Sequence, residues 1–197
     1  MSNDYEELPG RREFYAKLQP HQLVNQDSGI VDYCTPAFII ETARRTMGTI
    51  DLDPASNLVA NQTVKAKEFF DKYGLTHIWS GNVWLNHPFD RVQNARWIEK
   101  LINSYIHGDV SQACCITFAS TSEKWFQPLL QFPQCYLSPR TNYIRLDGTP
   151  VKGVTKGSVV TYLGSNFHAF AKEFDSLGNV VLPYAWIYGK RRLAVNA

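Results

Sequence analysis

The chain has 197 residues, of which 44% are hydrophobic, and this suits one domain built around a single sizeable core. Its formal net charge of +2 permits contact with nucleic acid but does not by itself argue for it. Because the sequence shows no signal peptide, no apolar run of about 18 residues and no CxxC spacing among its cysteines, we expect a soluble cytoplasmic protein with buried free thiols, without membrane contact or a metal site.

The first predicted helix follows a polar N-terminal segment. Residues 1–30 show breakers and little periodicity, so we expect an irregular arm there and a single domain over residues 31–197. Apolar residues at helical spacing predict a helix over residues 37–47 that ends before a glycine. We expect Thr35 as its N-cap and Pro36 as its first residue, a pair that an ordinary helix start explains equally well.

A short strand and an acidic turn come next. Residues 49–53 predict a strand that runs into Pro54-Ala55-Ser56. An acidic residue at a strand's end, followed by small residues that let a ligand approach the backbone, is a common way to hold a nucleotide-like cofactor. Either Asp51 or Asp53 suits this role. The glycine-rich turn typical of such sites is absent, and both aspartates also suit an ordinary helix cap.

The remaining elements alternate between helices and strands. They are, in order, a helix near residues 64–72, a buried strand from Val83, a helix near 94–105 with Trp97 on its core face, a strand over 113–118, a helix from 123, strands over 134–137 and 159–163, a helix over 167–174 and a strand over 180–186. This alternation predicts an α/β fold, a three-layer sandwich with a mostly parallel sheet.

The stretch Val83-Trp84-Leu85-Asn86-His87-Pro88-Phe89 carries the most specific chemistry. Pro88 stops the strand, so Asn86 and Phe89 are presented at its carboxyl end, where α/β proteins bind ligands. The Asn86 side-chain oxygen and the carbonyl of residue 87 suit an exocyclic amine of a nucleobase, which is a poor nucleophile until acceptors hold its hydrogens. Phe89 offers a ring for an extruded base, and S-adenosylmethionine would be the methyl donor. Asn before Pro is also common in ordinary turns.

A basic and aromatic segment lies further along the chain. Over residues 140–153, cationic side chains alternate with an aromatic ring, a pattern that suits phosphates and base stacking. An exposed polar hairpin without a partner is the alternative. The predicted contacts to nucleic acid are Arg91, in the loop after the strand, and Arg140, Asn142, Tyr143, Arg145 and Lys152.

Three segments stand in one order along the sequence: Tyr33-Cys34-Thr35-Pro36, then Asp51-Leu52-Asp53-Pro54-Ala55-Ser56, then Trp79-Ser80-Gly81-Asn82-Val83-Trp84-Leu85-Asn86-His87-Pro88-Phe89. In this arrangement the chain, over roughly residues 30 to 185, resembles the phage-type DNA N6-adenine methyltransferase (Dam) family. The resemblance implies a Rossmann-like, S-adenosylmethionine-dependent methyltransferase that flips an adenine out of double-stranded DNA, in the host cell cytoplasm if it is phage-encoded.

The resemblance also implies roles for individual residues. Carried over by position, the catalytic turn is Asn86, His87, Pro88 and Phe89, and the cofactor-binding residues are Thr35, Pro36, Asp51, Asp53, Pro54, Ala55 and Ser56. His87 stands where the family has a proline, and it fixes the turn less rigidly than a proline would. His87 is therefore either a tolerated substitution, a contact to a phosphate, or the mark of a protein that has lost catalysis.

Two other functions fit the same residues. One is a catalytically impaired DNA-binding or anti-restriction protein on the same fold, and the other is a methyltransferase for another exocyclic amine, such as cytosine N4. The chain is too short for a large separate recognition domain, so a short recognition sequence is expected. The sequence leaves open whether the protein is a monomer or a dimer.

Overall fold

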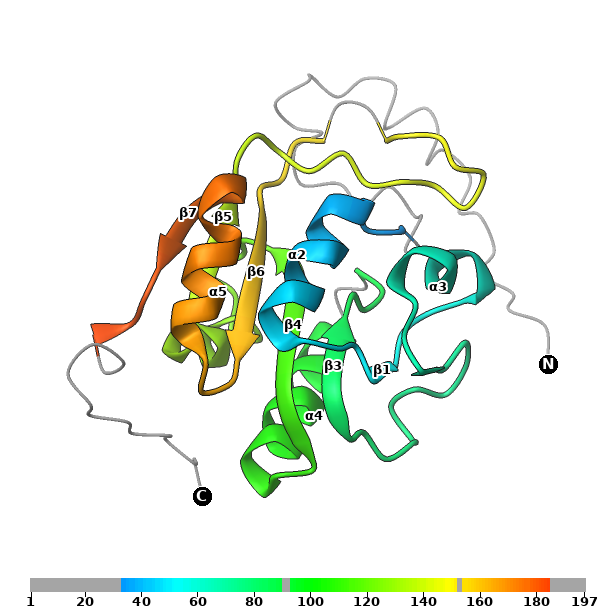
Figure 1. The fold of residues 1–197 in the computed structure, drawn as a ribbon, viewed down its shortest axis with the longest axis horizontal. Coiled ribbons are helices and arrows are strands. Elements are labelled where there is room, and N and C mark those ends of the chain that lie inside the picture. Colours follow the sequence, from blue (N-terminus) through cyan, green and yellow to red (C-terminus); the bar gives the residue numbers. More distant parts are fainter. Residues whose placement is uncertain (1–32, 90–92, 152–153, 185–197) are drawn as a thin grey trace, which may run out of the picture. The chain divides into compact units, whose positions relative to one another are not determined.

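The fold is organised around a seven-stranded sheet whose order is β2-β1-β3-β4-β6-β5-β7 (Figure 1). The computed structural model describes residues 33–89, 93–151 and 154–184. The strands are β1 (Leu52–Asp53), β2 (Glu68–Phe69), β3 (Gly81–Leu85), β4 (Val110–Phe118), β5 (Gln134–Leu137), β6 (Ser158–Leu163) and β7 (Gly178–Val181). The helices are α2 (Ala37–Met47), α3 (Leu58–Val64), α4 (Asn94–His107) and α5 (Phe167–Phe174), with short 3-10 helices η2 (Gln127–Gln131) and η3 (Asp175–Leu177).

The sheet is mixed in direction. Strands β2, β1, β3 and β4 run parallel to one another, whereas β6 is antiparallel to both β4 and β5, and β7 is antiparallel to β5. The α/β class and the sheet flanked by helices are therefore as expected, and the parallel direction holds for the half of the sheet that carries the predicted catalytic stretch.

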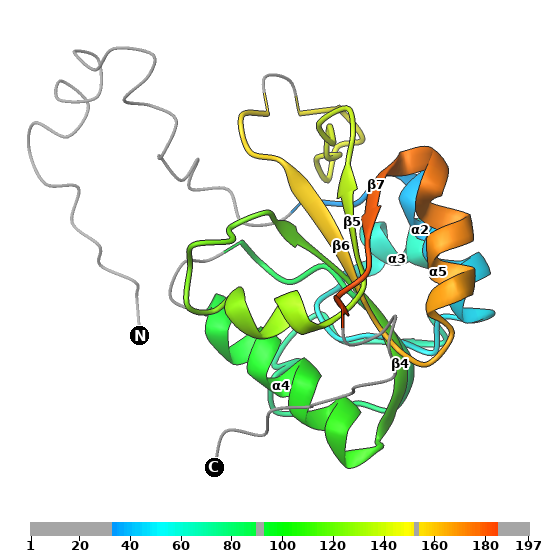
Figure 2. The ribbon, with the colours of Figure 1, turned by 90° about the vertical axis from the view of Figure 1, so that its left-hand side faces the viewer.

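Helices cover both faces of the sheet and create two cores. Alternate residues of β3 point to opposite faces, so Trp84 joins the core under α2 and α5, while Val83 and Leu85 join the core under α4. Figure 2 shows α4 on one side of the sheet and α2, α3 and α5 on the other. All three of these β3 side chains are fully buried, as in a strand covered on both faces.

The order of connections creates a switch point between β1 and β3. From β1 the chain passes through α3 to β2 on one side, and it then returns to the other side of β1 to form β3. Such a reversal leaves a crevice at the carboxyl ends of the two strands, and in open α/β sheets ligands bind there.

Most predicted elements are confirmed, but two predicted helices and the bounds of two strands are wrong. The strand expected over 49–53 covers only Leu52–Asp53, and the last strand lies at Gly178–Val181 and ends well before residue 186. The helices over 37–47 and 167–174 have the expected bounds, and α4 extends two residues beyond the expected end. The helix predicted at 64–72 instead lies at Leu58–Val64, and the later residues form β2. The predicted helix from residue 123 is replaced by turns and η2.

The start of α2 also differs from the expectation. Pro36 itself is the N-cap, with φ −55° and ψ 142°, and no side chain caps the helix. Thr35 therefore lies one residue before the cap, and its buried hydroxyl does not cap the helix. No helix among the described residues is long and apolar enough to cross a membrane.

Candidate functional site

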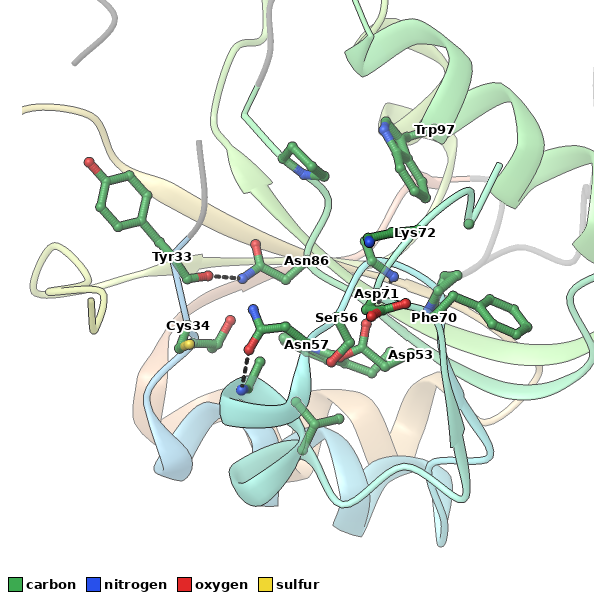
Figure 3. A pocket seen from close by; sticks show the side chains of 18 of the residues that line it. Tyr33, Cys34, Asp53, Ser56, Asn57, Phe70, Asp71, Lys72, Asn86 and Trp97 are labelled. Carbon is green, nitrogen blue, oxygen red and sulfur yellow. Dashed lines mark hydrogen bonds between the residues drawn. The ribbon is translucent and has the colours of Figure 1, made fainter. Parts of the chain in front are cut away.

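A cavity of about 300 Å³ lies where the segments following β1, β2 and β3 meet. Its walls include five predicted cofactor residues, Thr35, Asp53, Pro54, Ala55 and Ser56, and two residues of the predicted catalytic turn, Asn86 and Pro88. Figure 3 shows Asn86 and Tyr33 on one side of the cavity and Asp53, Ser56, Phe70 and Asp71 on the other. The fold thus brings together two sequence segments that were predicted separately.

The first wall follows β1. Asp53 is only 2% exposed, and its Oδ1 accepts a hydrogen bond from the Ala55 N–H at 3.3 Å. Burial raises the pKa of Asp53 to about 7, against the opposing effect of the Ser56 hydroxyl and the Ala55 N–H. Asn57 then begins α3, because its Oδ1 accepts the Ala60 N–H at 2.8 Å. This cap holds the Pro54-Ala55-Ser56 turn against the cavity.

The second wall follows β2 and was not predicted. It consists of Phe70, Asp71, Lys72, Tyr73 and Gly74. The Ser56 N–H donates to the Phe70 carbonyl at 2.9 Å, so this wall is tied to the first. The available signal for this wall was Asp71, an acidic residue just after a strand. In dinucleotide-binding folds an acidic side chain in such a position commonly binds ribose hydroxyls. The wall was missed because the segment was assigned to a helix.

Gly74 explains how closely the first two walls approach. A Cβ at this position would lie far inside van der Waals contact of the Pro54 carbonyl oxygen and 3.0 Å from the Trp97 ring. The Gly74 carbonyl also accepts the Trp79 indole N–H at 2.8 Å. Only a residue without a side chain fits this contact, so Gly74 sets the width of the cavity at that side.

The third wall is the end of β3. The Asn86 amide nitrogen donates to the Tyr33 carbonyl at 2.7 Å, which fixes the orientation of the side chain and leaves Oδ1 as an acceptor. Trp97, on α4, completes this wall, and its ring also stacks on Trp79 with centroids 5.9 Å apart. Trp97 was predicted as a core residue, and it is both buried and part of the cavity.

The other two residues of the predicted catalytic turn do not line the cavity. His87 is 1% exposed, and its ring faces Trp97 on the α4 side of the sheet. Burial lowers the pKa of His87 to about 4, so the imidazole is neutral at pH 7, although a hydrogen bond with the Pro88 carbonyl works the other way. The Phe89 ring is 8% exposed and stacks on Phe118 with centroids 4.3 Å apart.

Asp51 and Pro36, both predicted to bind the cofactor, lie outside the cavity lining. The Asp51 carboxylate accepts the Asn82 N–H at 2.9 Å and pairs with the Lys67 ammonium at 2.7 Å. It therefore holds the first residues of β3, at the opposite end of β1 from Asp53. Of the two alternatives left open by the sequence, Asp53 is the one at the cavity.

Thr35 lines the cavity and carries a buried hydroxyl without a hydrogen-bond partner among the described residues. Its side chain is 5% exposed. A buried hydroxyl of this kind usually contacts water or a ligand. The Asp53 carboxyl and the Asn86 amide oxygen supply hydrogen-bond acceptors in the same wall lining, which suits a ligand rich in hydroxyl and cationic groups.

The predicted nucleic-acid contacts fall into three groups. Arg140, Asn142 and Arg145 are exposed. Tyr143 is 2% exposed, and its hydroxyl pairs with Ser158 Oγ at 2.9 Å, so its ring is packed inside and does not offer a surface for stacking. Arg91 and Lys152 lie outside the described residues.

The exposed loop is linked to the cavity through the backbone. Cys34 and Ile144 exchange two hydrogen bonds, from Cys34 N to Ile144 O at 2.8 Å and from Ile144 N to Cys34 O at 2.9 Å. Because Tyr33, Cys34 and Thr35 all line the cavity, the loop that carries Arg140 and Arg145 is attached to the cavity rim.

Comparison with known proteins gives no family assignment. No protein-family model matches the chain, and no curated protein matches it. Within the described residues, no group of three or more His, Cys, Asp or Glu side chains is placed to hold a metal ion.

Proposed function

We propose that the protein is a DNA adenine N6-methyltransferase that uses S-adenosylmethionine. The observation that carries the proposal is that Asp53-Pro54-Ala55-Ser56 and Asn86 with Pro88 line one cavity at the switch point of the sheet. A cofactor-binding turn and an amine-binding turn that face the same space can bring a methyl donor and an acceptor within reach.

The residues of the cavity fit the proposed cofactor. Asp53 and Asp71 supply carboxyl groups for cationic and hydroxyl groups, and the Thr35 hydroxyl is buried and unpaired among the described residues. Asp71 follows β2, the position from which an acidic side chain commonly holds a ribose. When bound, S-adenosylmethionine supplies an electrophilic methyl group on its sulfonium.

Asn86 and the carbonyl of His87 would orient the target amine. The Tyr33 carbonyl accepts from Asn86 Nδ2, so the acceptor Oδ1 is the end of the amide that remains for the target amine. Two acceptors that bind the two hydrogens of an exocyclic amine direct its lone pair toward the methyl carbon. The new N–C bond forms as the donor's S–C bond breaks, and the amine then loses a proton to solvent. The described residues do not need to supply a strong base for this step.

The base would stack on Phe89, and the phosphates would contact the exposed arginines. In the structure the Phe118 ring occupies a face of Phe89. A flipped base that stacks on this face must displace Phe118, which lies at the end of β4 and is only half-buried. Arg140 and Arg145 lie on the loop joined to the cavity rim, where they would neutralise backbone phosphates.

The test is methyl transfer from labelled S-adenosylmethionine to unmethylated DNA, followed by digestion to nucleosides and mass analysis. Wild-type protein should yield N6-methyladenine, and Asn86→Ala should lower the rate on the order of a hundredfold or more, since it removes an acceptor of the amine. Asn103→Ala, an exposed asparagine on α4, is the matched control and should keep the wild-type rate. N4-methylcytosine as the product, identified against a standard by its retention as well as its mass, would instead assign transfer to cytosine N4.

A DNA-binding protein without turnover is the second candidate. The observation that favours it is the coverage of Phe89 by Phe118, which places the predicted base-stacking ring at 8% exposure. For this candidate, wild-type protein binds DNA and S-adenosylmethionine but transfers no methyl group to any DNA.

A further inference from the structure

The His87 side chain makes a specific set of contacts that the proposed methyl transfer does not use. Its backbone joins Asn86 to Pro88, and its ring turns away from the cavity into the core under α4. Nδ1 lies 2.9 Å from the carbonyl oxygen of Pro88. The ring is nearly parallel to Trp97, at 6.4 Å and 9°, and meets Phe89 and Trp125 edge-on at 6.1 Å and 6.5 Å.

The contact with Pro88 determines which nitrogen carries the proton. A carbonyl oxygen only accepts, so Nδ1 must donate, and in a neutral imidazole Nε2 then carries the lone pair. Nε2 is buried and has no hydrogen-bond partner among the described residues. The turn itself therefore determines the tautomer, because the hydrogen bond from His87 Nδ1 to the Pro88 carbonyl closes a loop between the side chain and the backbone of the next residue.

This hydrogen-bonded loop restrains the peptide groups on both sides of Pro88. The side chain of residue 87 holds the carbonyl of residue 88, so the orientation of the carbonyl of residue 87 and the direction in which Phe89 leaves the turn are both limited. Trp97 and Trp125 hold the imidazole from α4 and from the segment before η2. The turn is thereby anchored to the α4 face of the sheet.

We propose that His87 is a positioning residue, whose Nδ1–H bond to the Pro88 carbonyl fixes the turn that presents the residue 87 carbonyl and Phe89. The inference rests on the proposed function for its catalytic consequence, but the bond itself is a property of the fold. The imidazole therefore restrains the turn, and it neither contacts a phosphate nor marks a loss of catalysis.

The bond is tested directly by NMR of protein labelled with nitrogen-15 in histidine. At pH 7 the His87 ring should show a protonated Nδ1 and an unprotonated Nε2, with His87→Asn used to assign the signals. A protonated Nε2, or a doubly protonated ring at this pH, would overturn the proposal whether or not the protein transfers methyl groups.

A matched pair of variants tests the consequence. His87→Asn places an amide N–H close to the position of Nδ1, whereas His87→Gln places it close to the position of Nε2, and both lose the stacking on Trp97 equally. We expect His87→Gln to have a kcat on the order of ten- to a hundredfold below that of His87→Asn, through misplacement of the turn. The Kd for S-adenosylmethionine should be equal in the two variants.

His107 provides the control for the substitutions themselves. It makes the same kind of bond, from Nδ1 to the Asn103 carbonyl at 2.8 Å, but on the exposed end of α4. The Asn and Gln variants at His107 should not differ in kcat. Equal kcat for the two His87 variants would refute the positioning role. If wild-type protein transfers no methyl group, the proposed function fails instead, and a higher unfolding temperature for His87→Asn than for His87→Gln still supports the bond.

Discussion

Two buried titratable residues beside the site push stability in opposite directions with pH. Asp53 has a folded-state pKa raised from 3.8 to about 7, so between these values the folded protein binds more protons than the unfolded chain, and its contribution to stability is lost as pH rises. His87 has a folded-state pKa lowered from 6.5 to about 4, so between these values its contribution is lost as pH falls. From about pH 4 to 6.5 the two effects oppose each other.

Replacing either residue should reveal the effect of the other on the pH dependence of the free energy of unfolding. In Asp53→Asn only the His87 effect remains, so the free energy of unfolding should rise between pH 4 and 6.5, with a slope of up to about 1.4 kcal/mol per pH unit. In His87→Asn the free energy of unfolding should fall over the same range, and wild-type protein should change least. Denaturant unfolding at several pH values measures these slopes. Identical slopes in all three proteins would contradict the assigned pKa values.

Because burial raises the pKa of Asp53 to about 7, we expect this carboxyl to lose a proton if S-adenosylmethionine binds beside it. A cation placed beside a carboxyl lowers its pKa, and S-adenosylmethionine carries positive charge. Near pH 6.5, binding should therefore release up to one proton from Asp53, and Asp53→Asn should release none. Calorimetric titration in buffers of different ionisation enthalpy counts the protons. Equal release by wild type and variant would place the ligand's charge elsewhere.

At the scale of elements, the loop after β2 decides the shape of the cavity. Gly74→Ala should force the Pro54 turn and Trp97 apart, lowering the affinity for S-adenosylmethionine at least tenfold and stability by about 1–3 kcal/mol. Gly157→Ala is the control, because a Cβ there meets no atom within 4 Å. Cofactor titration and thermal unfolding measure the two effects. Unchanged affinity in Gly74→Ala would show that the cavity does not hold the cofactor.

Local sequence signals predicted the long elements well. Helices α2, α4 and α5 were found because each has a continuous apolar face, and α2 and α4 are each followed by a glycine, Gly48 and Gly108. The strand before Asn86 was found because Pro88 cannot extend it.

A strand of two residues is too short to show an apolar periodicity in the sequence. Strand β2 pairs only Glu68 and Phe69 with β1, so its existence depends on a distant partner and not on its own periodicity. The N-cap at Asn57 and the left-handed Lys65, which together bound α3, were the available signals against a later helix. Because this region was misassigned, the wall with Asp71 was missed, while the walls from Asp53 and Asn86 were predicted.

At the scale of the whole molecule, binding to DNA should depend on the loop joined to the cavity rim. The exposed Arg140 and Arg145 would each neutralise about one phosphate, so replacing both with Ala should reduce the slope of log K against log salt by about 2. Replacing the exposed Arg96 and Lys172, on α4 and α5, should leave the slope unchanged. Binding to labelled DNA at several salt concentrations measures it. Equal slopes for the two double variants would place the DNA elsewhere.

The short segment at Tyr33, Cys34 and Thr35 serves three neighbours at once. The Tyr33 carbonyl accepts from the Asn86 amide, Cys34 pairs with Ile144 of the loop that carries Arg140 and Arg145, and Thr35 lines the cavity. A ligand bound to the loop and a ligand bound in the cavity would therefore both act on the backbone of residues 33–35. By thermodynamic linkage, any factor by which a ligand on the loop strengthens binding in the cavity must reappear, unchanged, as the factor by which the cavity ligand strengthens binding on the loop.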